Sequence, residues 1–414
     1  MTRTARIEPP DVWLLGVVVA LVAVGVLLVF DASYARSADL SAYGHDTWYF
    51  AKRQLAYAAA GLVCMFLASI VPVEFLRKLS VVGLVISFAL LIAVLVPGIG
   101  CKVNGSTSWI RVGPVSFQPS ELAKLVLVLY LARALGRPNV FARRAERKWT
   151  SAFWIAAGII MLVVAEKDLG TAVALSGIVF VMFAAAGAKK RWLTLSALAG
   201  AAAVWLLMCC VPHCKPRVEA YKDPWAHRYG KGYQIVHSLI GFGTGGLTGV
   251  GFCEGRVKSY IPAASTDYIY ATVAEETGLV GSLVLLGMFV LFALRGFGVA
   301  RKCSSAYASL VASGITSAVS MQAVINMAVA TNSIPATGLP LPFISYGGSS
   351  MVISLTGVGV LLSVSRQVRV ELENEASDED SPYGRRYGRA HIPGRQRGTS
   401  APRAGAFGRA SVRG

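Results

Sequence analysis

The stretch VWLLGVVVALVAVGVLLVF at residues 12–30 contains no charged side chain and is long enough to cross the hydrocarbon core of a bilayer as a helix. Of the 414 residues, 55% are hydrophobic and 15% are charged, which lies outside the range of soluble domains. The sequence therefore predicts an all-α polytopic membrane protein with about ten transmembrane helices, or eight or nine under a stricter window. The nine further apolar windows are 53–72, 78–97, 119–136, 152–166, 169–188, 192–211, 268–294, 306–330 and 347–365.

Basic residues in the short loops set the predicted orientation. They cluster on one side of a ten-span chain, and the positive-inside rule makes that side cytoplasmic. Both termini are then cytoplasmic, and a large extracytoplasmic loop, 212–267, lies between spans seven and eight. The other segments that face outward are 31–52, 98–118 and 331–346. We expect a short cytoplasmic N-terminus at 1–11, a transmembrane domain at 12–370 whose first span is retained as the insertion signal, and a tail at 371–414.

The predicted tail differs in composition from the rest of the chain. Six acids between Glu371 and Asp380 precede eight arginines and no acid between Ser381 and Gly414. Such a tract cannot bury a core, so we predict a disordered cytoplasmic tail. It contributes to the net charge of +18, and it either anchors to anionic lipid or docks a cytoplasmic partner. Its aromatic residues are too few for a nucleic-acid surface, so no nucleic-acid partner is expected.

The seven cysteines form no CxxC or Cys/His pattern, so the sequence predicts no metal site. Cys101, Cys214 and Cys253 fall in or near predicted outer loops. An oxidising compartment would allow two of them to pair, and the sequence leaves the choice open.

Polar residues gather at the predicted outer ends of the spans. The helix that begins near 119 is expected to be capped by Ser120. Glu121 and Lys124 are three residues apart on that helix, which allows an ion pair. The pair either fixes the packing of span four or holds a substrate head group. Asp168, between spans five and six, is either the cap of span six or a functional residue.

Asp267 is a carboxylate at the point where a polar loop enters an apolar helix, which is a costly position and therefore indicates function. It follows a glycine-rich run at 241–251 and the basic residues Arg256 and Lys258. No strand precedes this run and no Lys-Ser/Thr follows it, which excludes a nucleotide-binding loop. Glu275 lies eight residues further, about 12 Å along a helix, so paired-carboxylate hydrolysis is not supported. A single base that activates a hydroxyl fits, and capping of span eight is the structural alternative.

Six strings stand out between residues 117 and 350: FQPSELAKL at 117–125, DLGTA at 168–172, GYQIVHSL at 232–239, GGLTGVG at 245–251, TDYIYATVAEETGLVG at 266–281 and GLPLPFISYGGSS at 338–350. Together and in this order they resemble the SEDS family (shape, elongation, division and sporulation), the polytopic peptidoglycan glycosyltransferases that include FtsW, RodA and SpoVE. DPW at 223–225 followed by GYQ is similar to the FtsW and SpoVE branch. The chain departs from the family pattern at Ser108, Lys167 and Ala263, where Arg, Pro and Glu are usual.

The resemblance implies polymerisation of lipid II into glycan strands at the outer face of the cytoplasmic membrane, with Asp267 as the catalytic carboxylate. The GlcNAc 4-hydroxyl of one lipid II would attack the anomeric carbon of an undecaprenyl-pyrophosphate-linked strand with inversion, and Asp267 would take its proton. Cations must stabilise the departing pyrophosphate, and we expect Arg217, Arg256 and Lys258 there. No cofactor is required, although a divalent cation could share that charge. The residues expected to bind substrate are Arg111, Glu121, Lys124, Asp168, Arg217, Gln234, Arg256, Lys258, Thr266, Ser345 and Tyr346.

The resemblance also implies a class B penicillin-binding protein, a transpeptidase, and other division proteins as partners. A lipid-linked precursor flippase or another transporter is the alternative function. Transporters place charges near the bilayer midplane and often contain inverted repeats, whereas the polar residues here gather at the outer interface. A scaffold that only recruits division proteins would leave Asp267 without a role.

Overall fold

The computed structural model describes residues 10–39, 46–103, 106–113, 115–136, 143–210 and 215–379. Each of the ten apolar windows coincides with a helix. These helices are α1 (Val12–Asp39), α2 (Tyr49–Ile70), α3 (Val73–Leu95), α4 (Pro119–Leu135), α5 (Arg143–Ala165), α6 (Leu169–Ala185), α7 (Lys190–Cys210), α11 (Ile269–Lys302), α12 (Ala306–Ala330) and α13 (Gly348–Glu379).

Six helices in the described part of the chain are long and apolar enough to cross a membrane: α1, α2, α3, α11, α12 and α13. Two shorter apolar stretches are also helical: Trp149–Ala165, within α5, and Leu169–Ala185, which is the whole of α6. The protein is therefore an integral membrane protein, and the count of ten crossings stays a prediction.

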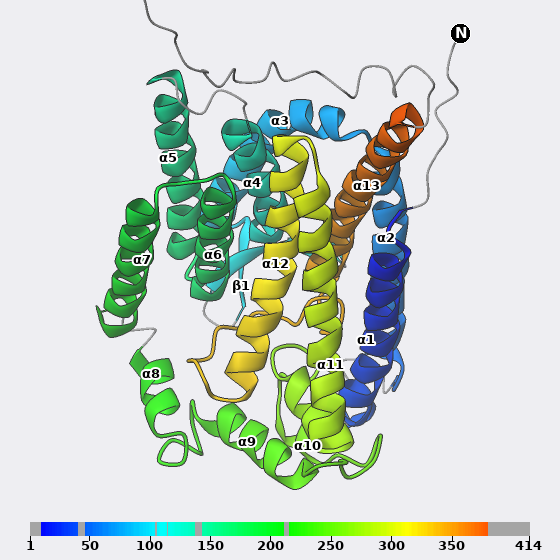
Figure 1. The fold of residues 1–414 in the computed structure, drawn as a ribbon. Coiled ribbons are helices and arrows are strands. Elements are labelled where there is room, and N and C mark those ends of the chain that lie inside the picture. Colours follow the sequence, from blue (N-terminus) through cyan, green and yellow to red (C-terminus); the bar gives the residue numbers. More distant parts are fainter. Residues whose placement is uncertain are drawn as a thin grey trace, which may run out of the picture. The chain divides into compact units, whose positions relative to one another are not determined.

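α12 forms the centre of the helical bundle. It packs against α4, α6 and α11, and it lies among them in Figure 1. Of its most apolar window, 72% is buried, against 28% for α2 and for α3. Small residues permit this close packing: a Cβ on Gly314 would lie 2.5 Å from Val128 of α4, and one on Gly296 of α11 would lie 2.2 Å from the Thr316 hydroxyl.

α11 is interrupted at Gly278, whose backbone has φ 67° and ψ −162°. A Cβ at this position would lie 2.4 Å from the backbone nitrogen of Gly249, so the site accepts only glycine. Residues 269–276, before the interruption, are all buried. After it, Leu279 and Val280 are about half exposed. The interruption thus separates a segment enclosed by protein from one that offers an apolar face to lipid.

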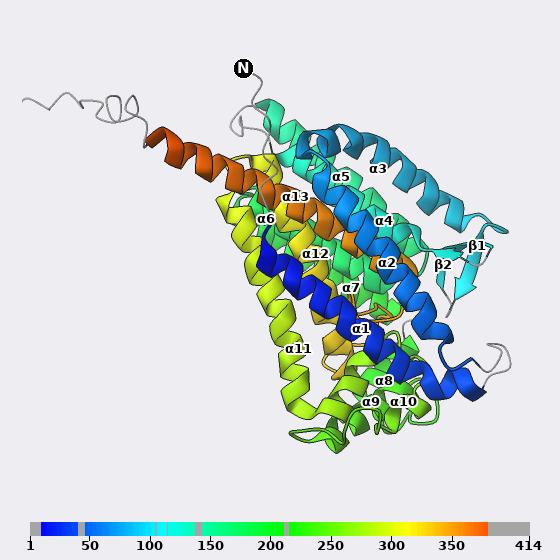
Figure 2. The ribbon, with the colours of Figure 1, turned by 90° about the vertical axis from the view of Figure 1, so that its right-hand side faces the viewer.

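The two long loops contain structure that the hydropathy pattern does not indicate. Residues between α3 and α4 form an antiparallel sheet of β1 (Gly100–Val103), β2 (Ser106–Val112) and β3 (Val115–Phe117), in the order β1-β2-β3. The all-α expectation is wrong at this point, where β-branched and aromatic residues in STSWIRV favour a strand. The 212–267 loop contains α8 (Lys215–Lys222), α9 (Tyr233–Gly245) and α10 (Val257–Tyr260), which gather at one end of the bundle (Figures 1 and 2).

Two boundaries differ from the sequence prediction. α4 begins at Pro119 with Gln118 as its N-cap, and the Ser120 hydroxyl is buried without a hydrogen-bond partner among the described residues. Ser120 is therefore not the cap, because proline takes the first helical position and the cap lies two residues earlier than predicted. Among the described residues, one compact unit ends at Arg369, at the boundary predicted between the transmembrane domain and the tail to within one residue. The predicted disorder of the tail beyond residue 379 falls outside the described residues.

Candidate active site

Asp267 lies on a non-helical segment just before α11, and the last polar motif of the chain holds that segment. The backbone N–H of Tyr346 donates to the carbonyl of Ser265 at 2.8 Å. The Ser345 hydroxyl donates to the carbonyl of Thr266 at 2.5 Å. Segments about 80 residues apart in the sequence therefore form one site.

A third contact comes from α12. The side-chain amide of Asn326 donates to the carbonyl of Asp267 at 2.9 Å. The N-cap of α11 is Tyr268, and no side chain caps this helix end. Capping of span eight, the structural alternative for Asp267, is therefore wrong.

Burial raises the pKa of Asp267 from 3.8 to about 6, although the Arg217 guanidinium and a hydrogen bond from Thr266 act in the opposite direction. Arg217, on α8, donates to the carbonyl of Ala336 at 3.2 Å. Gly338 has φ 81°, and a Cβ there would lie 3.8 Å from the Asp267 Oδ2. The carboxylate is therefore ionised at neutral pH, more basic than an exposed aspartate, and free of a side chain at residue 338.

A second acidic group lies near Asp267. Asp168 caps α6, one of the two roles that the sequence left open, by accepting from the Thr171 backbone N–H at 3.0 Å, and it also accepts from the Gln118 side chain at 3.0 Å. Its negative charge raises the pKa of Asp267 further. The neighbouring Glu166 is fully buried, and burial followed by repulsion from Asp168 raises its pKa to about 8. Glu166 is thus largely protonated at neutral pH.

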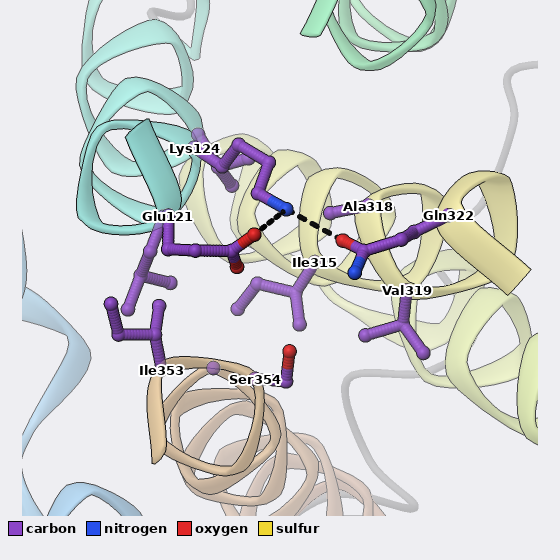
Figure 3. A pocket seen from close by; sticks show the side chains of 11 residues that line it. Glu121, Lys124, Ile315, Ala318, Val319, Gln322, Ile353 and Ser354 are labelled. Atoms are coloured by element: carbon purple, nitrogen blue, oxygen red, sulfur yellow. Dashed lines mark hydrogen bonds and ion pairs between the residues drawn. The ribbon is translucent and has the colours of Figure 1, made fainter. Parts of the chain in front are cut away.

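The ion pair allowed by the sequence spacing is present inside the bundle. Lys124 Nζ lies 2.8 Å from Glu121 Oε1, and their side chains are 7% and 2% exposed. Figure 3 shows Lys124 also reaching Gln322 of α12, whose Oε1 accepts at 2.5 Å. A cavity of about 40 Å³ between α4, α12 and α13 adjoins these groups. The pair therefore bridges α4 to α12, as the packing alternative requires.

Residues 12–370 match the cell cycle protein family of FtsW, RodA and SpoVE. The chain belongs to this family. It is 38% identical over 367 residues to stage V sporulation protein E of Bacillus subtilis, covering 88% of this chain and 100% of the relative. It is also 38% identical over 369 residues to the probable peptidoglycan glycosyltransferase FtsW of Saccharophagus degradans, covering 88% and 94%.

Two solved structures agree with this membership of the FtsW, RodA and SpoVE family. One, described as structural coordination of polymerization and crosslinking by a peptidoglycan synthase complex, matches with a TM-score of 0.71 and 31% identity, covering 87% of this chain and 98% of the other. The other is the rod shape determining protein RodA of Thermus thermophilus, with a TM-score of 0.64 and 30% identity, covering 86% and 97%.

Lys258 differs from its predicted role. We expected its ammonium beside Asp267, facing a pyrophosphate. Instead it pairs with Asp31 of α1 and, at 2.6 Å, with Glu276 of α11. Burial alone would lower its pKa, but the hydrogen bonds to these two carboxylates outweigh burial and raise it. The ammonium is therefore held inside the protein as a tie between α1, α10 and α11.

The neighbouring loop is likewise held by acids of α11. Glu275 accepts from the backbone N–H groups of Arg256 and Val257 at 3.0 and 2.9 Å. Glu276 accepts from Cys253 and Gly255 at 3.2 and 3.3 Å. These backbone donors, which would otherwise suit an anionic ligand, are occupied by the protein's own carboxylates. The Arg256 side chain is exposed, so of the three predicted pyrophosphate cations only Arg217 acts on Asp267 in the structure.

Sequence reasoning missed the first turns of α2. The Gln54 side chain, fully buried, donates to the carbonyl of Ser345 at 3.2 Å. Arg53 hydrogen-bonds to the Tyr346 hydroxyl, and Phe50 packs edge-to-face on the Tyr346 ring with centroids 5.1 Å apart. The polar residues that open span two were the only sequence signal, and nothing local paired them with the 338–350 string.

The remaining predicted residues lie on the outer elements. Arg111 is exposed on β2, and Gln234 is half-buried in the first turn of α9. Cys101 and Cys253 are free, and Cys214 falls outside the described residues. Over the part of the chain that the structure describes, no group of three or more His, Cys, Asp or Glu side chains could hold a metal ion.

Proposed function

We propose that this protein is a peptidoglycan glycosyltransferase that polymerises lipid II, with Asp267 as the general base. The observation that most directly supports this proposal is the Asp267 carboxylate. Hydrogen bonds to the backbone of its segment hold it in place, and burial raises its pKa to about 6. Its basicity matches the demand of the reaction, because a base works best with a pKa close to the operating pH. Relatives named as probable peptidoglycan glycosyltransferases support the assignment of the reaction.

In the proposed reaction, the 4-hydroxyl oxygen of one lipid II forms a bond to the anomeric carbon of the growing strand. The bond between that carbon and the pyrophosphate oxygen breaks, so that configuration inverts and a β-1,4 linkage results. The hydroxyl proton passes to Asp267 Oδ1 or Oδ2, and the electron pair of the broken bond leaves with undecaprenyl pyrophosphate. We assign to Arg217 the stabilisation of that leaving group, because its charge already acts on the neighbouring Asp267.

A divalent cation could share with Arg217 the charge of the departing pyrophosphate. The described residues offer no cluster of three or more ligating side chains, so an ion would have to be held mainly by the pyrophosphate itself. We place the reaction at the outer face of the cytoplasmic membrane, in septum synthesis, with both termini cytoplasmic. A class B penicillin-binding protein is the proposed partner, supported by the similarity to a solved complex described as coordinating polymerization and crosslinking.

The test is incubation of the purified protein, alone and with its transpeptidase partner, with fluorescent lipid II, followed by gel separation of the products. We expect glycan polymer from the wild type and none from Asp267→Asn. Asp46→Asn, which removes an exposed carboxylate paired with Lys52, is the matched control and should polymerise normally. Transport of lipid II across vesicles with no polymer under any condition would favour the flippase alternative and refute this proposal.

A further inference from the structure

Two amide side chains on one face of α12 connect the buried ion pair to the catalytic segment. Gln322 and Asn326 are one helical turn apart, and they are 3% and 1% exposed. Gln322 accepts from Lys124 and donates to the carbonyl of Pro340 at 2.9 Å. Asn326 donates to the carbonyl of Leu339 at 2.7 Å and to that of Asp267 at 2.9 Å.

The segment at 339–340 runs along α12 so that successive carbonyls meet successive amides. Pro340 has no N–H and a fixed φ, which limits the ways in which this segment can move. Gly338, next to it, faces the Asp267 carboxylate. If the Gln322 and Asn326 side chains shift along α12, Asp267 and the backbone at Gly338 that faces it therefore move together.

The hydrogen bonds that these two amides donate go to the 338–350 segment and to Asp267, while Gln322 also accepts from Lys124 of α4. The donors of Gln322 reach Pro340 and, at 3.3 Å, Ser350, and those of Asn326 reach Leu339 and Asp267. The carbonyls of Asp267 and Leu339 also fix the orientation of the Asn326 amide, because they accept from its nitrogen and would repel its oxygen in the same place. Apolar residues of equal volume would satisfy the bundle core without exposing polar groups to hydrocarbon, so the amides need another explanation.

We propose that Gln322 and Asn326 are positioning residues that hold the Asp267 carboxylate at a fixed distance from the buried Lys124–Glu121 ion pair. The expected loss of polymerisation rate rests on the proposed function. The expected loosening of the segment around Asp267 rests on the hydrogen bonds alone. The ion pair is then an internal anchor of the base, which gives Glu121 and Lys124 a role without contact with substrate.

The experiment compares Asn326→Leu with the wild type, using Val324→Ala as the control because Val324 lies on the same helix and is 57% exposed. Asn326→Leu keeps the volume and removes both donors. We expect kcat for lipid II polymerisation to fall about 10- to 100-fold, the usual effect of misplacing a catalytic group by about 1 Å, with KM changed less than about 3-fold. Asn326→Gln, which keeps the N–H donors on a longer arm, should recover part of the rate.

The pH profile separates positioning from a change of charge. Burial raises the pKa of Asp267 most, Arg217 and Thr266 lower it and Asp168 raises it, and Asn326→Leu removes none of these charges and keeps the site apolar, so the acid limb near pH 6 should stay in place while the plateau falls. A residue needed only for folding would instead reduce the yield of folded protein and leave the rate per folded molecule unchanged. A folded Asn326→Leu protein with kcat within about 2-fold of the wild type overturns the proposal.

Hydrogen exchange provides a readout that does not depend on activity. The backbone N–H groups of Thr266 and Tyr268 both donate to the carbonyl of Ala263. They should exchange about 10-fold faster in Asn326→Leu and unchanged in Val324→Ala, since the segment loses a tether. If the wild type forms no polymer, the proposed function fails and the exchange data still decide the positioning role. If Asn326→Leu does not fold, Gln322→Leu, which breaks the neighbouring contact, decides it by the same measurements.

Discussion

Replacing Asp267 by Asn should remove activity and at the same time stabilise the protein at neutral pH. Folding raises the pKa of this carboxyl from 3.8 to about 6, so the native state disfavours its ionised form. The free-energy penalty for burying the ionised carboxylate is absent below pH 3.8, grows as the pH rises, and is complete above pH 6, so it lowers the stability of the folded protein at neutral pH. A shift of about 2 units corresponds to roughly 3 kcal/mol, and partial exposure of the side chain reduces this to about 1–2 kcal/mol.

The assay is thermal unfolding of the detergent-purified protein at pH 8 and at pH 4. Asp267→Asn should raise Tm by a few degrees at pH 8 and leave it unchanged at pH 4, where the native aspartic acid is already neutral. Asp46→Asn is a control of opposite sign, because the Lys52 hydrogen bond lowers the pKa of Asp46 and its charge is favourable when folded. A gain in Tm that is equal at both pH values, or a loss at pH 8, would refute the argument that burial opposes the Asp267 charge.

The other predictions concern the neighbouring elements. Lys258→Met should lower the free energy of unfolding by about 3–5 kcal/mol, because it leaves two buried carboxylates unpaired, while KM for lipid II stays constant; a large rise in KM at unchanged Tm would restore its role at the pyrophosphate. Gly278→Ala should destabilise the protein by at least about 2 kcal/mol through its positive φ and lack of space, whereas Gly298→Ala, with open space around it, should not, as Tm measurements will show. The polymerisation rate should rise with pH up to about 6 and then level off, following ionisation of Asp267, and a flat profile down to pH 5 would exclude it as the base. Truncation after Val370 should leave polymerisation in detergent nearly unchanged, since a cytoplasmic tail cannot reach across a core about 30 Å thick, and a folded but inactive truncate would contradict this.

Local signals in the sequence predicted local structure well. The 306–330 window matches α12 residue for residue, because hydropathy alone marks a helix in the membrane. Asp168 caps α6 through Thr171, three residues further, and Lys124 pairs with Glu121 over the same spacing. In each case both partners stand within one helical turn, where spacing translates directly into distance.

Contacts between distant parts of the chain were not predictable in the same way. The Lys258 ammonium was expected at the pyrophosphate, and its partner Asp31 was missed. Asp31 lies 227 residues away in the sequence, and no sequence pattern joins the two residues. In the sequence Asn326 is an ordinary polar residue in an apolar helix. Only the structure shows that it donates to the carbonyl of Asp267, 59 residues earlier. The charge of a residue is visible in the sequence, but which opposite charge or carbonyl it meets is decided by the packing of the helices.

The interruption at Gly278 also bears on how the site responds to the membrane. An unbroken helix over Ile269–Lys302 would be about 51 Å long, well beyond a hydrocarbon core of about 30 Å, and it would have to tilt to match. With the break, only residues 279–302, about 36 Å of helix, need to adjust to bilayer thickness. Tilting of that part is absorbed at the glycine, so the enclosed residues 269–276, and Asp267 just before them, keep their place. Membranes of different thickness should therefore support similar rates of chemistry.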